Sequence, residues 1–382
     1  MKTNNIKEPL IHLTKREAMP LGISMLARVI AFVLGMLVCG AAAFLLIDKL
    51  RLNPSRIGEF YMCFIKGSFS TGAKMWKFFK NMSVLLCIAL ALTPAFKMRF
   101  WNTGAEGQTL MGVLAAVAVN FYLGGKFNAS IRFPDWALLI LMLLAALLAG
   151  AIWGVIPALF KAKWDTNETL FTLMMNYIAT FIVTFCLMKW VPNGSASLSK
   201  LDSGKFPTVF NFKRPAYSDY MLIIIIVLLL TALLYIYLNY SKHGYEISVV
   251  GESLRTAKYI GINVKKVIIR TMILSGMLCG VAGWLIGAGL DRSVTTDSVG
   301  GQGFTAIMVA WLAKFNPLTM ILTSGVIIFL NQGADQISTS FDVSGAFPDV
   351  IIGIVLFFII GCEFFINYKL NFRKKSVQEA LR

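Results

Sequence analysis

A polar block in this largely apolar chain, NTGAEGQ at residues 102–108, contains residues that could do chemistry. It is followed directly by an apolar segment. A charged side chain at the centre of a membrane helix costs at least about 2.5–3.5 kcal/mol on insertion scales. Glu106 would occupy the first turn of the following helix, where free N–H groups and the positive end of the helix dipole favour a carboxylate. The block is either a capped helix end in a tight turn or part of a permeation path or its gate. The candidates for the second role are Asn102, Glu106 and Gln108.

A second polar block, NETLFTLMMNY at residues 167–177, starts with a residue that is suited to capping a helix. Asn167 can accept a hydrogen bond from the first free backbone N–H groups, so this helix start needs no functional explanation. Asn176 lies about 13 Å further along the helix axis, within the apolar span. An amide at that depth must either bond to neighbouring helices or line an aqueous path, and both alternatives stay open.

Two glycine-rich blocks follow. In SGMLCGVAG at residues 275–283, the pair Gly276 and Gly280 has the GxxxG spacing that lets membrane helices pack closely, with helix sliding during transport as the alternative. Ser275 at its start is a further candidate for the path. The block GGQGF at residues 300–304 precedes a short apolar segment that ends at Asn316-Pro317, which predicts a broken or re-entrant helix. Its candidate path residues are Gly303 and Phe304.

The loop GESLRTAKYIGINV at residues 251–264 predicts a short capped helix. Ser253 can cap its N-terminus, and Leu254 to Ile260 make two turns. Gly261 can adopt the left-handed backbone conformation that often ends a helix. Leu254, Ala257 and Ile260 fall roughly on one face, with basic residues beside them. Such a helix is either a docking element for a cytosolic partner or an interfacial helix that lies on anionic lipid.

The elements that must position these blocks are membrane helices. Of the 382 residues 57% are apolar and 14% are charged, whereas soluble proteins carry about a quarter charged residues. Apolar runs of spanning length lie near residues 24–47, 82–96, 107–123, 136–160, 168–190, 220–240, 267–289 and 349–367. We predict an all-α, polytopic integral membrane protein with about ten membrane helices, including a broken or re-entrant pair over residues 304–331.

Loop charges predict the orientation. Lys and Arg gather at both ends of the chain and in the 241–266 loop, whereas the 332–348 loop contains Asp335 and Asp342 but no Lys or Arg. Both termini and the 241–266 loop are therefore expected on the cytoplasmic side. The same topology places the basic stretch 48–80 on the outer side of the membrane, although basic loops usually lie on the cytoplasmic side. Ile57 to Phe79 is therefore interpreted as an amphipathic or re-entrant segment. The expected divisions are a cytoplasmic segment 1–23, a transmembrane domain 24–367 and a cytoplasmic tail 368–382.

Several other functions are disfavoured. The 36 Lys and Arg lie mostly between apolar runs, so the net charge of +17 does not indicate nucleic-acid binding. The nearest match to a P-loop, GSFSTGAK at residues 67–74, has its lysine one place late and no Ser or Thr after it, so the chain is not expected to hydrolyse ATP. Two histidines and six cysteines without a CxxC pair predict no catalytic residue, no metal site and no cofactor.

Taken in order, these blocks resemble the permease subunits of ABC transporters, in the branch that imports ribose-type sugars, branched-chain amino acids and nucleosides. They are most similar to the nucleoside and simple-sugar subgroup, over about residues 80–365. The matching residues are Asn102, Gly104 to Gln108, Asn167, Glu168, Met174, Asn176, Tyr177, Ala257, Tyr259, Gly261 to Val264, Ser275, Gly276, Gly303, Phe304, Ile307, Val309 and Ala310. The chain departs from the family pattern at Ser253-Leu254, where Asn-Pro is usual.

The resemblance implies a function and partners. The 251–261 segment would be a coupling helix seated in a cleft of a separate cytosolic ATP-binding subunit. The coupling residues would be Gly251, Glu252, Ser253, Leu254, Arg255, Ala257, Lys258, Tyr259 and Gly261. With a second permease subunit, identical or not, the chain would form a translocation path for nucleosides or simple sugars in a bacterial cytoplasmic membrane, supplied by an extracytoplasmic binding protein. An ion-gradient-driven secondary transporter is the alternative, because broken helices suit it too.

Overall fold

The structure is a computed structural model that describes residues 11–16, 20–47, 53–127, 133–191, 197–207, 215–343 and 346–372. Most of the basic residues that predict cytoplasmic ends lie outside these ranges: Lys2, Lys7, Arg373, Lys374, Lys375 and Arg382. The chain divides into two compact units. We name them the terminal unit, residues 1–68 with 329–382, and the central unit, residues 69–328.

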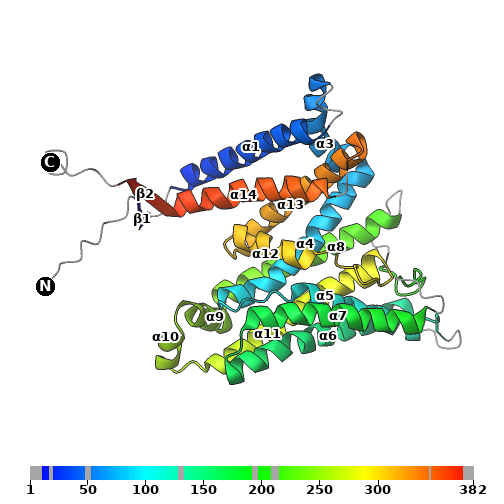
Figure 1. Cartoon of the computed structure of the whole chain (residues 1–382). Helices are drawn as coiled ribbons and strands as arrows, with labels where there is room; N and C mark the ends of the chain where they lie inside the picture. The colour runs from blue at the N-terminus through cyan, green and yellow to red at the C-terminus, as the bar shows by residue number, and fades with distance from the viewer. Residues whose placement is uncertain are drawn as a thin grey trace, which may run out of the picture. The chain divides into compact units, whose positions relative to one another are not determined.

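The central unit is built mainly from long helices (Figure 1). Its elements are α4 (Gly72–Lys97), α5 (Ala105–Leu123), α6 (Asp135–Trp164), α7 (Glu168–Trp190), α8 (Pro215–Tyr240), α9 (Lys242–Glu252), α10 (Leu254–Tyr259), α11 (Val264–Trp284), the π-helical η2 (Leu285–Leu290), α12 (Gln302–Leu312) and the first part of α13 (Pro317–Phe341).

Helix α11 lies at the core of the central unit because glycines let its backbone meet the backbones of neighbouring helices. A Cβ atom placed on Gly276 would collide with the carbonyl oxygen of Gly150 on α6, and one on Gly280 would collide with that of Ala146. On another face, a Cβ on Gly283 would lie 2.5 Å from the carbonyl oxygen of Thr109 on α5. The GxxxG spacing therefore reports close packing, as the sequence predicts.

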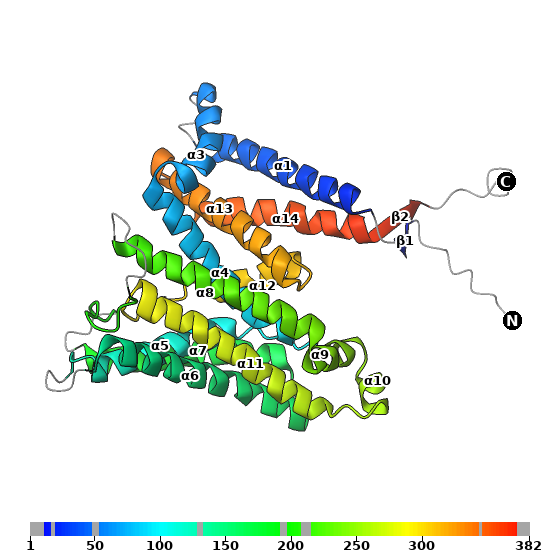
Figure 2. The ribbon, with the colours of Figure 1, turned by 180° about the vertical axis from the view of Figure 1, so that it is seen from behind.

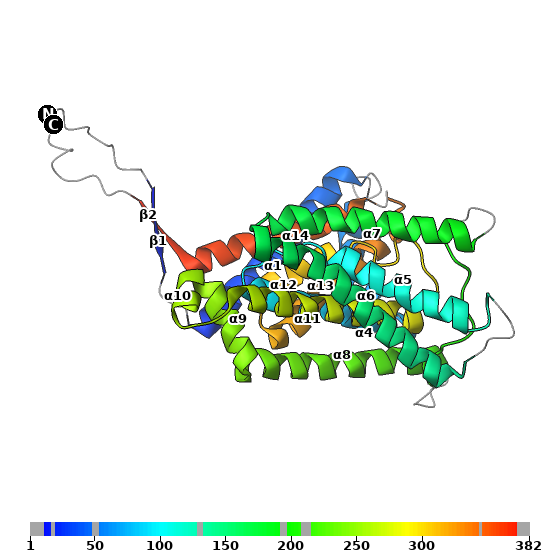
Figure 3. The same cartoon turned by 90° about the horizontal axis from the view of Figure 1, so that it is seen from below.

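The two ends of the central unit have different structures (Figure 3). Helices α9 and α10 lie at one end, beside the end of α4, where a Cβ on Gly251 would collide with the Lys97 carbonyl oxygen. At the opposite end, residues 197–207 lie against the outer turns of α5 and α6. Ser203 Oγ donates to Asn120 Oδ1 at 2.9 Å, and the Gly204 N–H donates to Asp135 Oδ1 at 2.9 Å.

The terminal unit joins segments from both ends of the chain. Its elements are β1 (Ile11–Lys15), α1 (Leu21–Leu46), the 3-10 helix η1 (Pro54–Arg56), α3 (Ile57–Phe69), the later part of α13, α14 (Phe347–Asn367) and β2 (Tyr368–Phe372). Helices α1 and α14 run side by side (Figures 1 and 2), and Arg28 Nε bonds to Glu363 Oε1 across them at 2.6 Å. Strands β1 and β2 pair antiparallel with Ile11 opposite Phe372.

The observed helices confirm the all-α, polytopic fold and correct some boundaries. Among the described residues, eight helices are long and apolar enough to cross a membrane; the 19-residue α5 and the 11-residue α12 are the other predicted segments. The predicted break is confirmed, because α12 ends before Ala313 and α13 restarts at Pro317. Helix α4 starts ten residues before the predicted run, with Thr71 Oγ1 accepting the Lys74 N–H at 3.3 Å.

Two further predictions need correction. Residues 332–341 were expected in an outer loop but continue α13 as helix. Their polar composition suggests a loop, yet Ala334, Ile337 and Phe341 are buried at helical spacing, which holds the segment in a helix. The strand pair was not predicted, because it depends on pairing between the two ends of the chain rather than on any local pattern. The expected divisions at residues 23/24 and 367/368 stay predictions.

Candidate functional site

Three predicted path residues meet in one buried polar cluster in the central unit. The Asn102 side-chain N–H donates to Gln108 Oε1 at 3.3 Å and to Ser275 Oγ at 3.2 Å. Gln108 Nε2 donates back to Asn102 Oδ1 at 3.1 Å. The exposed fractions of these side chains are 0% for Asn102, 1% for Gln108 and 0% for Ser275. The α4–α5 loop, the first turn of α5 and the middle of α11 are therefore joined through side-chain hydrogen bonds.

Asn176 joins α7 to the same region. Its side-chain N–H donates to the carbonyl oxygen of Thr103 at 2.9 Å, and its Oδ1 accepts the backbone N–H of Gly107 at 2.9 Å. Glycine is needed at 107, since a Cβ there would lie 2.9 Å from the Asn176 Cα. The Thr103 and Thr172 hydroxyls are 2.9 Å apart, which adds a second link between the loop and α7.

Glu106 connects the first turn of α5 to that of α12. Its carboxylate accepts the Gly301 N–H at Oε1 (2.9 Å) and the Gly303 N–H at Oε2 (2.7 Å). Gly301 has a φ of +72°, which favours glycine, and a Cβ on Gly303 would lie 2.5 Å from the Glu106 backbone nitrogen. The carboxyl group therefore lies between the N-termini of two helices, whose positive dipole ends favour its ionised form.

The structure thus brings six of the seven predicted path residues into adjoining hydrogen-bonded positions. The seventh, Phe304, follows Gly303 on α12 and is 43% exposed. The polar groups of the cluster satisfy one another within the protein, which accounts for amides within an apolar helix bundle. That these residues line a translocation path stays a prediction.

The second predicted site, the loop between α8 and α11, is a pair of short helices. Ser253 caps α10, with its Oγ accepting the Thr256 N–H at 3.2 Å, and Gly261 leaves the helix at a φ of +82°. Both features are as the sequence predicts. Helix α9 was not predicted; Ser241 caps it, with its Oγ accepting the Gly244 N–H at 3.0 Å. A capping serine followed by buried Ile247 and Val250 at helical spacing is the signal that could have revealed it.

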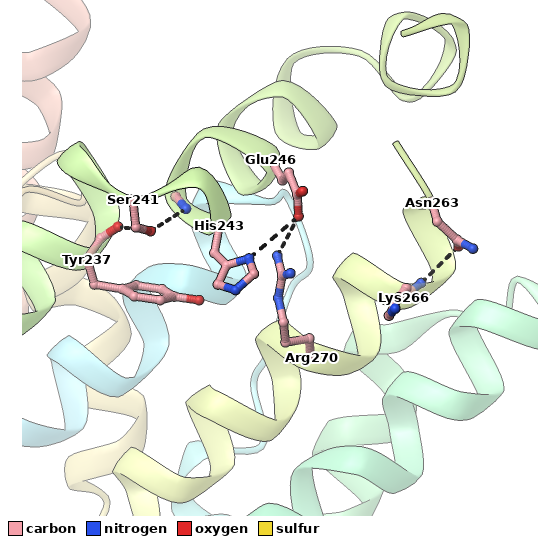
Figure 4. Close-up of polar contacts among 8 residues, drawn as sticks. Tyr237, Ser241, His243, Glu246, Asn263, Lys266 and Arg270 are labelled. Atoms are coloured by element: carbon pink, nitrogen blue, oxygen red, sulfur yellow. Dashed lines mark hydrogen bonds and ion pairs between the residues drawn. The ribbon is translucent and has the colours of Figure 1, made fainter. Parts of the chain in front are cut away.

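An ion pair between Glu246 on α9 and Arg270 on α11 joins the two helices (Figure 4). Arg270 Nη2 lies 2.8 Å from Glu246 Oε2, and His243 Nδ1 lies 3.8 Å from the same oxygen. The hydrogen bond from Arg270 lowers the pKa of the Glu246 carboxyl. At the start of α11, Asn263 Oδ1 accepts the Lys266 N–H at 3.2 Å. This pair was not predicted, because its members are 24 residues apart on different helices.

Helix α10 exposes most of its side chains. Ala257 is buried, but Leu254 is 55% exposed, Ile260 is 49% exposed and Tyr259 is 92% exposed. The result is an end of the central unit where exposed apolar side chains stand beside the exposed Arg255 and Lys258.

Comparison with known proteins places the chain in a family. The family described as "Branched-chain amino acid transport system / permease component" matches residues 74–360. That range includes the polar cluster, the α9–α10 loop and the broken helix pair. No solved structure matches the chain.

Three curated relatives match about three quarters of the chain. It is 29% identical to the guanosine ABC transporter permease protein NupP of Bacillus subtilis over 73% of this chain and 79% of the relative. It is 28% identical to the glucose ABC transporter permease protein TsgB13 of Haloferax volcanii, over 75% of this chain and 76% of the relative. It is 25% identical to the nucleoside ABC transporter permease protein NupB of Lactococcus lactis, over 73% and 77%.

Proposed function

This chain belongs to the family of permease components of the branched-chain amino acid transport type, and we propose that it is the membrane-spanning subunit of an ATP-driven importer of nucleosides or simple sugars. The multi-pass helical fold suits such a subunit. The names of the three relatives specify guanosine, nucleosides and glucose, which favours those solutes over amino acids.

The observation that carries the proposal is the structure of the α9–α10 end. Two capped helices lie between α8 and α11, anchored to α11 by Arg270 and Glu246, and expose Leu254, Tyr259 and Ile260. A rigidly held element that exposes apolar side chains is suited to bind a partner protein. In this proposal the element seats in a cytosolic ATP-binding subunit through residues 251–261.

Motion would pass from α10 to the membrane through α11. Helix α11 follows α10 directly, carries Ser275 and packs on α5 and α6 through its glycines. Displacement of α10 by an ATP-binding subunit would therefore act on the polar cluster that contains Asn102 and Gln108. The chain supplies no ATPase site in this proposal.

The remaining partners follow from the same role. A second permease subunit, identical or different, would supply the other half of the path, and an extracytoplasmic binding protein would deliver the solute. The chain would lie in a bacterial cytoplasmic membrane with both termini in the cytoplasm. The 241–266 loop would then face the cytosol, in agreement with its excess of Lys and Arg.

Co-expression tests this function. The chain, a candidate second permease, an ATP-binding subunit and the extracytoplasmic binding protein would be co-expressed in cells that lack nucleoside and glucose uptake. We expect the ATP-binding subunit to co-purify with the chain, and uptake of guanosine or glucose to need both ATP and the binding protein. Uptake that continues without the ATP-binding subunit but stops when the ion gradient is collapsed would contradict the proposal.

A further inference from the structure

A cavity of about 610 Å³ lies beside α10 in the central unit. Its walls come from the end of α4 (Met98, Arg99, Phe100), the turn between α6 and α7, the end of α9, α10 and the start of α11. All of these segments lie at the α9–α10 end of the unit. The volume is ample for a small organic molecule, since ligand pockets usually measure about 300–1,000 Å³.

The cavity lining has an excess of positive charge. Its five cations are Arg99, Lys161, Lys163, Lys258 and Lys265, and its three carboxylates are those of Asp165, Glu168 and Glu252, which gives a formal charge of 5 − 3 = +2. Two of the three carboxylates are engaged by one cation, because Lys161 Nζ lies 2.8 Å from Asp165 Oδ1 and 3.0 Å from Glu168 Oε2.

The other cations have not been neutralised in this way. Within the described part of the chain, no salt bridge involves Arg99, Lys258 or Lys265, and Lys163 lies over the ring of Trp164 at 4.5 Å. Lys161 and, to a smaller extent, the charge of Lys258 lower the pKa of the Asp165 carboxyl. Four side chains from four different segments (the end of α4, α6, α10 and α11) therefore present positive charge around one space.

The backbone of Arg99 adds an independent observation. Arg99 has a φ of +58° at the end of α4, where its N–H bonds to the Phe96 carbonyl oxygen at 2.9 Å and that of Phe100 bonds to Ala95 at 3.0 Å. Glycine is the usual residue in this position, because a left-handed conformation is unfavourable for a residue with a side chain. These two hydrogen bonds end α4 in a left-handed turn, and they fix the backbone position from which the Arg99 side chain reaches the cavity.

The lining also has an apolar part. Met98 is buried, and Val250, Leu254, Val264 and Ile268 complete a wall without charge. A ligand that fits both parts has an anionic group for the cations and an apolar or planar body for the wall. Phosphate suits this set of cations, because arginine can bind it through paired N–H donors and lysine through a point charge.

We propose that this cavity binds a phosphate monoester that carries an organic body. A soluble organic phosphate and the headgroup of phosphatidic acid are both phosphate monoesters, and separate binding assays distinguish the two sources. A bound phosphate would bridge Lys258 on α10 to Arg99 at the end of α4, and so would hold α10 against the membrane helices. Binding itself does not depend on the proposed transport function; only its effect on transport does.

The test uses the purified full-length chain in nanodiscs. Adenosine 5′-monophosphate is titrated in phosphatidylcholine nanodiscs, with adenosine as the uncharged control, and a second arm measures retention of phosphatidic acid in mixed nanodiscs. Saturable binding of the monophosphate but not of adenosine identifies a soluble ligand, and selective retention of phosphatidic acid alone identifies a lipid. The proposal is overturned if neither binds.

Matched variants assign the binding to the cavity. Arg99→Gln with Lys258→Gln should lower the affinity for the phosphate ligand by at least about tenfold, as expected for loss of two charge-assisted hydrogen bonds. Lys265→Gln should also weaken binding, whereas Lys266→Gln, one residue away and outside the lining, should not. All four side chains are exposed, so these variants should fold as the unaltered chain does. Equal affinity in Arg99→Gln/Lys258→Gln and in Lys266→Gln contradicts the proposal.

Discussion

The carboxylate of Glu106 accepts the backbone N–H of Gly303 at 2.7 Å and so fixes the start of α12 to the start of α5. The Gly301 N–H binds the other oxygen of the same carboxylate at 2.9 Å. Helix α12 also packs on α4 and buries Ala306, Val309 and Ala310. The carboxylate therefore adds a polar link at the N-terminus of a helix whose remaining turns are held by packing.

Glu106→Gln should loosen that junction. A neutral amide offers one acceptor oxygen in place of two and carries no charge between the helix ends. We expect a loss of about 1.5–3 kcal/mol, the usual value of a hydrogen bond to a charged group. The thermal unfolding midpoint in detergent measures this loss of stability. Thiol labelling of the Gln302→Cys variant, with and without Glu106→Gln, measures the loosening at the start of α12.

The control for this change is Glu59→Gln, an exposed carboxylate that pairs with Arg56 at 2.8 Å on the surface of the terminal unit. Surface pairs contribute about 0–1 kcal/mol, so its unfolding midpoint should hardly move. A midpoint for Glu106→Gln within the range of this control would show that the carboxylate does not hold α12.

Gly276→Ala should destabilise the central unit. The added Cβ would collide with the Gly150 carbonyl oxygen, so α11 and α6 would have to move apart. Gly361→Ala on α14 is the matched control, because a Cβ there meets nothing within 4 Å. In a helix, replacing glycine with alanine at an open position stabilises by about 0.5–1 kcal/mol. The two variants should therefore change the unfolding midpoint in opposite directions; the same direction for both would contradict the packing.

Tyr259→Ser should weaken co-purification of an ATP-binding subunit without changing the stability of the chain. Tyr259 is 92% exposed, so its loss removes little internal packing. A tyrosine that is an interface hot spot contributes about 2 kcal/mol, which is about thirtyfold in affinity. Tyr240→Ser, at another exposed tyrosine (77%), is the control. Pull-down from co-expressing cells provides the measurement, and equal recovery with both variants would exclude Tyr259 from the interface.

The Glu246–Arg270 pair should make the α9–α11 contact sensitive to acid. The pKa of Glu246 is lowered from 4.5 in the folded chain, so the pair stabilises the fold fully above about pH 4.5. This contribution decreases as the pH falls from there through the lower folded value, where the carboxyl is protonated. Glu246→Gln should therefore be less stable than the unaltered chain at pH 7, and the difference should shrink towards pH 3. Unfolding midpoints across that range measure it; a difference that grows on acidification would have the wrong sign.

The sequence predicts local features of this fold well and distant pairings poorly. The capping of α10 by Ser253 and its exit at Gly261 depend on neighbouring residues, and both are predicted correctly. The break at Asn316-Pro317 is local too. By contrast, the bonds from Asn102 to Ser275 and from Glu106 to Gly303 join segments that are 173 and 197 residues apart. Periodicity identifies such polar residues as unusual but cannot assign their partners, as the unpredicted Glu246–Arg270 pair illustrates.

The contact between α11 and α6 places backbone against backbone at Gly276, Gly280 and Gly150. In ordinary helix packing, side chains of one helix sit in grooves of the other, and axial movement must lift each of them out. Few side chains stand between these two helices at this contact, so we expect that the spacing is fixed firmly while the resistance to travel along the helix axis is small. Displacement of α10 would then move α11 along the axis of α6 with little resistance.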